Sequence, residues 1–148
     1  VEEIFILARK LPEFKFIVMG SVRDYFHLKE KPSNVGFTGV TTDTEKEVYL
    51  SIADIAINPM LTGSGTNLKM LDYMAGGIPV VSTLVGARGL DIPEGYIALC
   101  SIDEFDTCIK DIDKYVDTEK SRLYVQKNFS WEVIQENLTK ALNAAQLV

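Results

Sequence analysis

A glycine-rich segment near the middle of the chain has the residue types that bind phosphate groups. Residues 62–68 read TGSGTNL and lead into a predicted helix. Glycine lets backbone N–H groups approach a ligand, and a helix N-terminus adds unpaired N–H donors and partial positive charge. The alternative is an ordinary glycine loop that joins a strand to a helix. We predict a diphosphate site formed by Gly63, Ser64, Gly65, Thr66, Asn67, Leu68 and Lys69.

An acidic residue follows in the same predicted helix. Asp72 lies seven residues after Gly65, and its carboxylate can accept hydrogen bonds from sugar hydroxyl groups. One segment therefore has the groups to bind both the phosphates and the sugar of a nucleotide. Alternatively, Asp72 pairs with Lys69 on the helix surface, which contributes only about 0.2–0.5 kcal/mol. Lys69 itself either reaches toward the phosphates or is solvated.

The elements that position this segment alternate between strands and helices. Short apolar runs bounded by turn residues predict strands at residues 14–19, 35–40, 55–57, 79–82 and 96–100. Helical spacing and capping residues, such as Thr44 with Glu47, predict helices at residues 1–11, 42–53, 67–75, 103–115, 118–127 and 131–145. This order predicts an α/β fold, a doubly wound Rossmann-like parallel sheet with helices on both faces.

Ligands of doubly wound sheets bind at the carboxyl ends of the strands. Two further groups of residues follow predicted strands and therefore become candidates for contacts with a phosphate or a base. They are Ser21 and Arg23 after the first strand, and Gly39, Val40 and Thr41 after the second. Arg23 is equally well explained as a surface arginine. The core is predicted to include Leu68, Met70, Leu71 and Met74, and Trp131 is predicted to anchor the last helix.

The run GSGTNLKMLDYMAGGIPVVST, residues 63–83, resembles the donor-binding motif of the group 1 glycosyltransferases, retaining family 4-like enzymes of the GT-B fold. The resemblance extends to residues 14–21, 34–40, 54–59 and 129–131. It implies that residues 1–148 are one donor-binding domain, the C-terminal half of a GT-B fold, whose N-terminal acceptor domain is absent. It also implies that the first strand of this half precedes Val1, or that the sheet is completed in another way.

The same resemblance assigns roles to the candidate residues. It places the donor diphosphate on the glycine loop, the ribose at Asp72, and the base against backbone groups near Val40. Ser64 stands where many members carry a glutamate that lies near the transferred sugar, so a backbone amide or the Ser64 hydroxyl takes over that contact. No catalytic residue is assigned.

Composition narrows the choice of ligands. The net charge of −6 disfavours nucleic acid as a partner. No cluster of metal-ligating residues is visible, and no cofactor is expected beyond the nucleotide-sugar substrate.

Cys100 and Cys108 are predicted to be reduced thiols, and His27, the only histidine, to be a surface residue. There is no membrane-spanning run and no signal peptide, so we expect a cytoplasmic protein, with a peripheral membrane contact only through the absent domain.

The resemblance implies a metal-independent hexosyltransferase that moves a sugar from a nucleotide-diphosphate sugar to an acceptor glycan or lipid-linked glycan in polysaccharide biosynthesis. The isolated domain is expected to be inactive. One alternative is a non-catalytic nucleotide-binding or scaffold module with the same fold, and another is a related GT-B nucleotide-sugar epimerase. Self-association through the incomplete sheet is a further expectation, because an unfilled strand position leaves edges unpaired.

Overall fold

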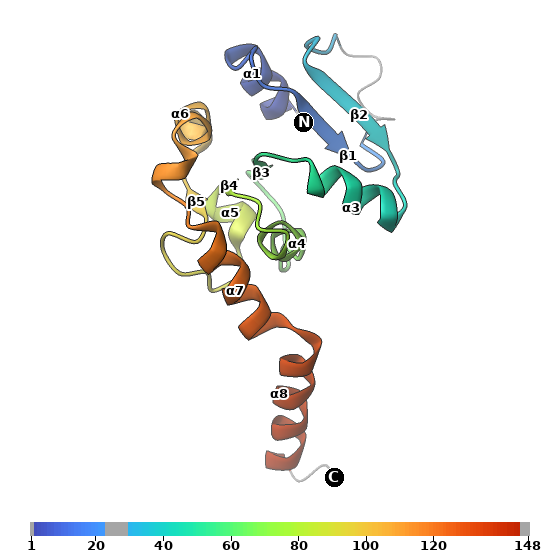
Figure 1. Ribbon diagram of the computed structural model, residues 1–148, viewed down its shortest axis with the longest axis vertical. Helices are drawn as coiled ribbons and strands as arrows, with labels where there is room; N and C mark the ends of the chain where they lie inside the picture. The colour runs from blue at the N-terminus through green and yellow to red at the C-terminus, as the bar shows by residue number, and fades with distance from the viewer. Residues whose placement is uncertain (1, 23–29, 146–148) are drawn as a thin grey trace.

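Strands and helices alternate along the folded chain, as predicted. The computed structural model describes residues 2–22 and 30–145 (Figure 1), so Arg23 and His27 lie outside the described residues. The strands are β1 (Phe16–Met19), β2 (Val35–Gly39), β3 (Ala56–Asn58), β4 (Val80–Ser82) and β5 (Ala98–Leu99). The α-helices are α1 (Glu2–Lys10), α3 (Asp43–Ser51), α4 (Lys69–Ala75), α5 (Leu84–Ala87), α6 (Phe105–Lys110), α7 (Thr118–Phe129) and α8 (Trp131–Ala144).

All strand pairs are parallel, and they form two sheets. β1 pairs with β2, beginning with Phe16 opposite Val35. The second sheet has the order β3-β4-β5, with Ala56 opposite Val80. Within residues 2–22 and 30–145, no ladder joins β1 to β3. A doubly wound half with strand order 3-2-1-4-5-6 would be divided in this way if its first strand were missing.

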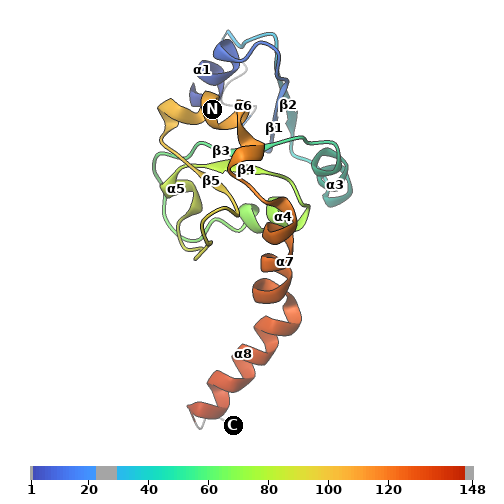
Figure 2. The same cartoon turned by 60° about the vertical axis from the view of Figure 1, so that its left-hand side comes forward.

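Helices cover both faces of the sheets. Figure 2 shows α1 and α6 on one side of β3 and β4, with α4 and α7 on the other, and α1 contacts α6 while α4 contacts α7. The core on the first side contains Leu11 and Phe105, which are fully buried. The core on the second side contains Met70 and Met74, also fully buried. These two methionines hold α4 against the sheet and so determine where the preceding glycine loop lies.

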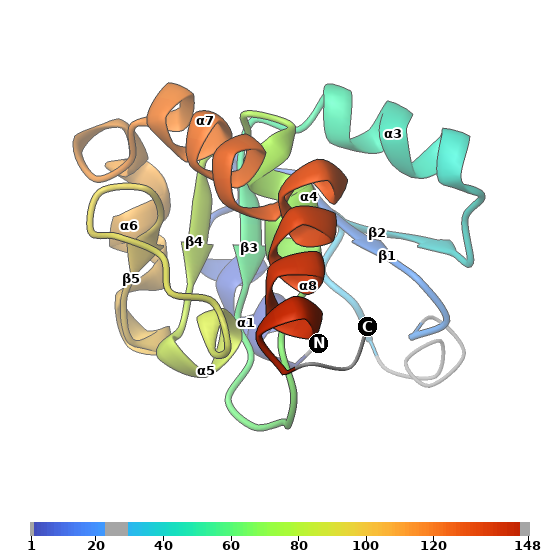
Figure 3. The same cartoon turned by 90° about the horizontal axis from the view of Figure 1, so that it is seen from below.

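The C-terminal helix differs from its prediction. α8 follows α7 and extends away from the rest of the domain (Figures 1 and 2), and Figure 3 views the molecule from the α8 end. None of its residues is buried, and Trp131 is 82% exposed. The prediction that Trp131 anchors the helix in the core is therefore wrong, because Ser130 redirects the chain between the two helices. Ser130 instead caps α8 by accepting a hydrogen bond from the N–H of Val133.

Two other helices begin or break at unpredicted places. The capping box of α3 is formed by Thr42 and Glu45, since the Thr42 N–H donates to the Glu45 carboxylate at 2.8 Å and the Glu45 N–H donates to Oγ1 of Thr42 at 3.2 Å. The predicted pair Thr44 and Glu47 has the same spacing but falls inside the helix. The helix predicted at 103–115 consists of η1 (Ile102–Glu104), α6 and η2 (Ile112–Lys114), and Asp111 leaves helical geometry between α6 and η2.

No helix in the described part of the chain combines the length and apolar character that crossing a bilayer requires. In the same residues, no three His, Cys, Asp or Glu side chains gather as a set of metal ligands.

The two cysteines, eight residues apart in sequence, are neighbours in the fold. Burial, together with a hydrogen bond to the Cys108 thiol, raises the pKa of Cys100 from 9.0 to about 12. Between these values the folded protein binds more protons at Cys100 than the unfolded chain, so the stability that this thiol contributes is present below pH 9 and is lost as the pH rises toward 12.

We therefore expect the thermal midpoint of the wild type to fall more steeply than that of Cys100→Ser between about pH 8.5 and pH 11, in melts followed by circular dichroism. The variant is the internal control, since tyrosines that titrate in the same range are common to both proteins. Parallel curves for the two proteins would contradict this role of Cys100.

Candidate functional site

The glycine loop, residues 62–68, lies between β3 and α4, directly before the helix, and presents unpaired backbone donors. Gly63 and Gly65 have φ values of +146° and +73°, which residues with a side chain rarely adopt. From Gly63 to Leu68, among the described residues, no backbone N–H group donates a hydrogen bond to the protein. The glycine loop is exposed apart from Asn67, which is partly buried. Six consecutive amides in a largely exposed segment thus have no acceptor among the described residues.

The helix after the glycine loop begins later than predicted. α4 starts at Lys69, and Leu68 has helical φ and ψ without a side-chain cap. Leu68 is 66% exposed, so its assignment to the core is wrong, whereas Met70 and Met74 are fully buried. The reason is helical phase: Met70 and Met74 are four residues apart and face the sheet, and Leu68 precedes the helix on its open side.

Side chains beneath the glycine loop hold it against the segment that follows β4. The side-chain amide of Asn67 donates to the carbonyl oxygen of Gly86 at 2.8 Å, and that of Asn58 donates to the same oxygen at 2.9 Å. The hydroxyl of Thr83 donates to the Met60 carbonyl oxygen and accepts from the Gly86 N–H at 2.9 Å. Asn67, predicted as a diphosphate residue, therefore uses its side chain for support and leaves only its backbone for a ligand.

An arginine lies directly behind the glycine loop. Arg88 follows α5, and its Nη2 donates to the Ser64 carbonyl oxygen at 2.6 Å while its Nη1 donates to the Val85 carbonyl oxygen at 2.8 Å. A Cβ atom added at Gly63 would lie 2.9 Å from Nη2. The guanidinium group is therefore packed against the residue that needs the most unusual backbone geometry in the glycine loop.

Asp72 pairs with a residue from another helix. Nζ of Lys46 on α3 lies 3.0 Å from Oδ2 of Asp72, and this hydrogen bond raises the pKa of Lys46. The Asp72 side chain is still 49% exposed. The alternative partner Lys69 forms no ion pair within the described residues, and desolvation of its ammonium group lowers its pKa. Lys69 is thus an unpaired cation at the start of α4.

The remaining candidates lie at the ends of β1 and β2. The Gly20 N–H donates to the Gly39 carbonyl oxygen at 2.8 Å, which joins the two strand ends. Ser21 and Val40 are exposed, and Thr41 is partly buried. Thr41 leads directly into the cap of α3, and the same helix carries Lys46. The ion pair between Lys46 and Asp72 therefore connects the β2–α3 region to α4, the helix that follows the glycine loop.

Four supporting residues were not found from the sequence: Asn58, Thr83, Gly86 and Arg88. Two of them could be predicted from their position, because Asn58 ends β3 and Thr83 follows β4. The carboxyl ends of neighbouring parallel strands meet at one edge of a sheet. The same rule selects Ser21 and Val40 after β1 and β2, and for β4 it points to Thr83.

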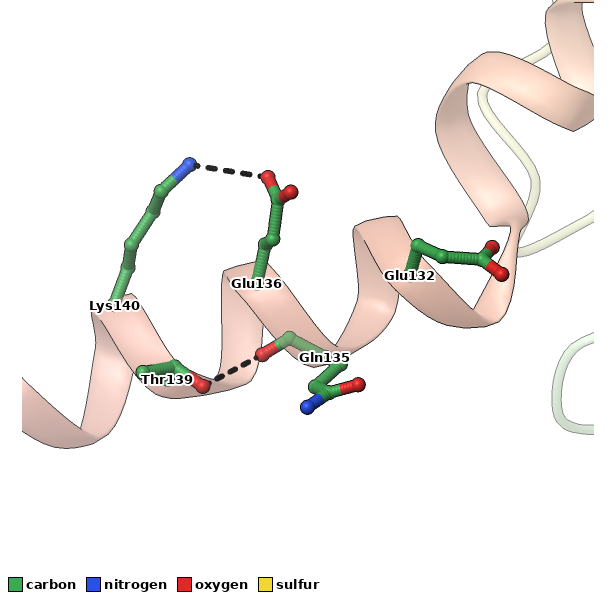
Figure 4. A pocket seen from close by; sticks show the side chains of 5 residues that line it. All are labelled: Glu132, Gln135, Glu136, Thr139 and Lys140. Carbon is green, nitrogen blue, oxygen red and sulfur yellow. Dashed lines mark hydrogen bonds and ion pairs between the residues drawn. The ribbon is translucent and has the colours of Figure 1, made fainter.

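Hollows elsewhere on the surface do not compete with this site. Figure 4 shows a shallow one along α8, where Glu136 and Lys140 form an ion pair of 3.9 Å and the Thr139 hydroxyl donates to the Gln135 carbonyl oxygen. All its lining residues come from this one helix, so it has no second wall. Another hollow lies between Gly95 and the start of α7, and it includes the ion pair of Asp117 with Lys120.

Comparison with known proteins gives matches over most of the chain. The family model described as "Glycosyl transferases group 1" matches residues 1–112. A curated relative, an uncharacterized 44.6 kDa protein in the cps region of Klebsiella pneumoniae, is 29% identical over 107 residues, which cover 67% of this chain and 27% of the relative.

Solved structures share the fold at low sequence identity. HepE of Anabaena in complex with UDP superposes with a TM-score of 0.76 and 16% identity, over 97% of this chain and 44% of HepE. The C-terminal domain of LpcC, a group 1 glycosyl transferase of Francisella tularensis, has a TM-score of 0.63 and 18% identity, over 88% of this chain and 77% of that domain. The chain thus spans less than half of HepE and about a quarter of the curated relative.

Proposed function

The chain belongs to the group 1 glycosyl transferases, and on this premise we propose that its glycine loop binds the diphosphate of a nucleotide-sugar donor. The observation that carries the proposal is the row of six unpaired backbone N–H groups from Gly63 to Leu68, within the described residues. Oriented N–H groups at the start of a helix are a recurrent anion site in α/β folds. HepE, which shares this fold, has been solved with UDP and with UDP-glucose, and this supports the same class of ligand.

The proposed catalysis depends on the negative charge that develops on the leaving diphosphate. In sugar transfer, the bond between the anomeric carbon and the diphosphate oxygen breaks, and the bonding electrons leave with the nucleoside diphosphate. N–H groups and cations that are already oriented toward that oxygen lower the barrier without reorganising. The loop amides and the unpaired Lys69 are suited to this task, since neither is occupied by a protein acceptor or a carboxylate in the described structure. We propose that transfer proceeds in this way with retention of the anomeric configuration and without a metal ion.

We infer that the sugar acceptor binds outside the 148 residues of this chain. The curated relative and HepE are considerably longer than this chain. We propose that a second domain binds a glycan or a lipid-linked glycan and provides the opposite wall of the active site. On this proposal, the 148-residue chain binds nucleotide weakly and transfers little sugar by itself.

The ribose assignment gives a direct test. We expect Asp72→Ala to weaken binding of a nucleoside diphosphate about fivefold, because one hydrogen bond to the ribose contributes about 1 kcal/mol. The measurement is titration of the protein with UDP, GDP and ADP up to millimolar concentration, followed by NMR. Asp111→Ala is the matched control, since Asp111 also forms a surface ion pair, with Lys114 at 2.7 Å.

The outcomes separate the parts of the proposal. Equal binding by wild type and Asp72→Ala would contradict the ribose assignment and leave the diphosphate site intact. If none of the three nucleotides binds, either to this chain or to the full polypeptide that contains it, the donor site itself is wrong.

Ser64 supports a second candidate function. The residue provides a hydroxyl where many family members have a carboxylate, and its carbonyl oxygen is engaged by Arg88. A non-catalytic nucleotide-binding module would retain the glycine loop and would not need that carboxylate. Nucleotide binding by the full polypeptide without any sugar transfer or donor hydrolysis would favour this candidate over the transferase.

A further inference from the structure

We propose that Arg88 acts from behind the glycine loop as a positioning residue for the donor diphosphate. It would orient the peptide group that follows Ser64 and provide a positive charge that the ligand neutralises. This inference rests on the proposed donor site and adds a residue from the segment after β4, a region to which the sequence motif assigns no ligand contact.

The first argument is the orientation of one peptide group. Nη2 of Arg88 donates to the Ser64 carbonyl oxygen at 2.6 Å, so this carbonyl points toward the guanidinium group. The described part of the chain has no cis peptide bond, and in a trans peptide the N–H points opposite to the C=O. The Gly65 N–H is therefore directed away from Arg88, and it donates to no acceptor among the described residues.

The second argument is charge. Nη1 and Nη2 each donate to a backbone carbonyl, and Nε is buried without a partner. No ion pair of Arg88 occurs among the described residues, although the whole chain has a net charge of −6. A partly buried cation that lacks a carboxylate is costly to keep in the folded state. An anion bound on the glycine loop would neutralise the positive charge of Arg88.

The third argument is packing. Gly63 lies against both the guanidinium group and the Met60 side chain, since a Cβ there would approach Nη2 and Cε of Met60 to 2.9 Å and Nη1 to 3.2 Å. Thr66 is held in a similar way against Gly89, where a Cβ would lie 2.5 Å from Oγ1 of Thr66. The glycine loop and the Arg88 segment are therefore packed as one unit, so a change in Arg88 is transmitted to the loop backbone.

The test compares two substitutions of Arg88 with a matched control. Arg88→Gln removes the charge but retains N–H donors, and Arg88→Lys retains the charge but loses the forked geometry. Arg122→Gln is the control, because Arg122 is an α7 arginine already paired with Glu119 at 3.1 Å. Affinities are measured by NMR titration for the nucleoside diphosphate that the wild type binds best among UDP, GDP and ADP, and for the corresponding nucleoside. Thermal melts establish that each variant is folded.

We expect Arg88→Gln to weaken diphosphate binding about fivefold and to leave nucleoside binding unchanged, with Arg88→Lys closer to the wild type and Arg122→Gln equal to it. The diphosphate affinity of Arg88→Gln should also depend less on salt. Unchanged diphosphate binding in Arg88→Gln, or equal losses for diphosphate and nucleoside, would overturn the inference. If Arg88→Gln does not fold, a folded Arg88→Lys that loses as much diphosphate affinity as nucleoside affinity overturns it as well. Failure of the wild type to bind any nucleotide would instead count against the proposed function.

Discussion

Replacing Gly86 with alanine is expected to lower the free energy of unfolding by about 1–3 kcal/mol, the range for overpacking a buried site. A Cβ at Gly86 would lie 2.5 Å from Oγ of Ser82 and 2.7 Å from the backbone oxygen of Asn58. Neither atom can move freely, since both belong to buried strand ends. For a domain of this size each kcal/mol lowers the melting temperature by roughly 2–4 °C, so the effect is measurable in a thermal melt.

The effect of Gly86→Ala extends to the glycine loop. The Gly86 carbonyl oxygen accepts the side-chain amides of both Asn58 and Asn67, so displacing Gly86 weakens the support of the loop as well as the core. Gly76→Ala is the control, because Gly76 has a φ of −69° and a Cβ there would make only ordinary contacts at 3.4 Å. If both variants melt like the wild type, the close packing of α5 against β3 and β4 is incorrect.

Gly63→Ala is expected to weaken binding of a nucleoside diphosphate about tenfold or more. The φ of +146° at Gly63 is accessible essentially to glycine alone, and a Cβ would also collide with the guanidinium group of Arg88. The unfavourable φ and the displaced guanidinium group then change the backbone conformation of the glycine loop, so its N–H groups lose their wild-type orientation. A tenfold loss corresponds to about 1.4 kcal/mol, which is within the cost of such backbone strain.

Gly65→Ala separates the effect of backbone strain from the effect of contact with Arg88. Gly65 also has a positive φ, +73°, but nothing lies within 4 Å of the Cβ position. We expect a smaller loss of affinity than in Gly63→Ala, because the added Cβ meets no neighbouring side chain, and the cost of about 1–2 kcal/mol for the left-handed region is present with and without ligand. Calorimetric or NMR titration of both variants with the same nucleotide provides the comparison. A larger loss in Gly65→Ala than in Gly63→Ala would show that contact with Arg88 is not important.

Local signals in the sequence were sufficient for the order of elements and for the position of the glycine loop. Strands were recognisable as short apolar runs, and glycines at turns and threonine or serine at caps act within a few residues of the chain. The prediction of α4 was wrong by only two residues at its start, and its buried Met70 and Met74 were identified correctly. Errors such as Trp131 arose where exposure depends on how one helix is placed against another.

The amino-acid sequence by itself determined that this protein has a doubly wound α/β fold with a glycine loop before a helix, because those features depend on neighbouring residues. Only the tertiary structure decided which side chains support the glycine loop and which remain unpaired. Asp72 pairs with Lys46, 26 residues away, rather than with Lys69, three residues away, and Arg88 binds Ser64 across 24 residues. These contacts form because parallel strands bring segments that are distant in sequence to the same edge of the sheet. Residue types and local spacing do not show which distant residues will meet there.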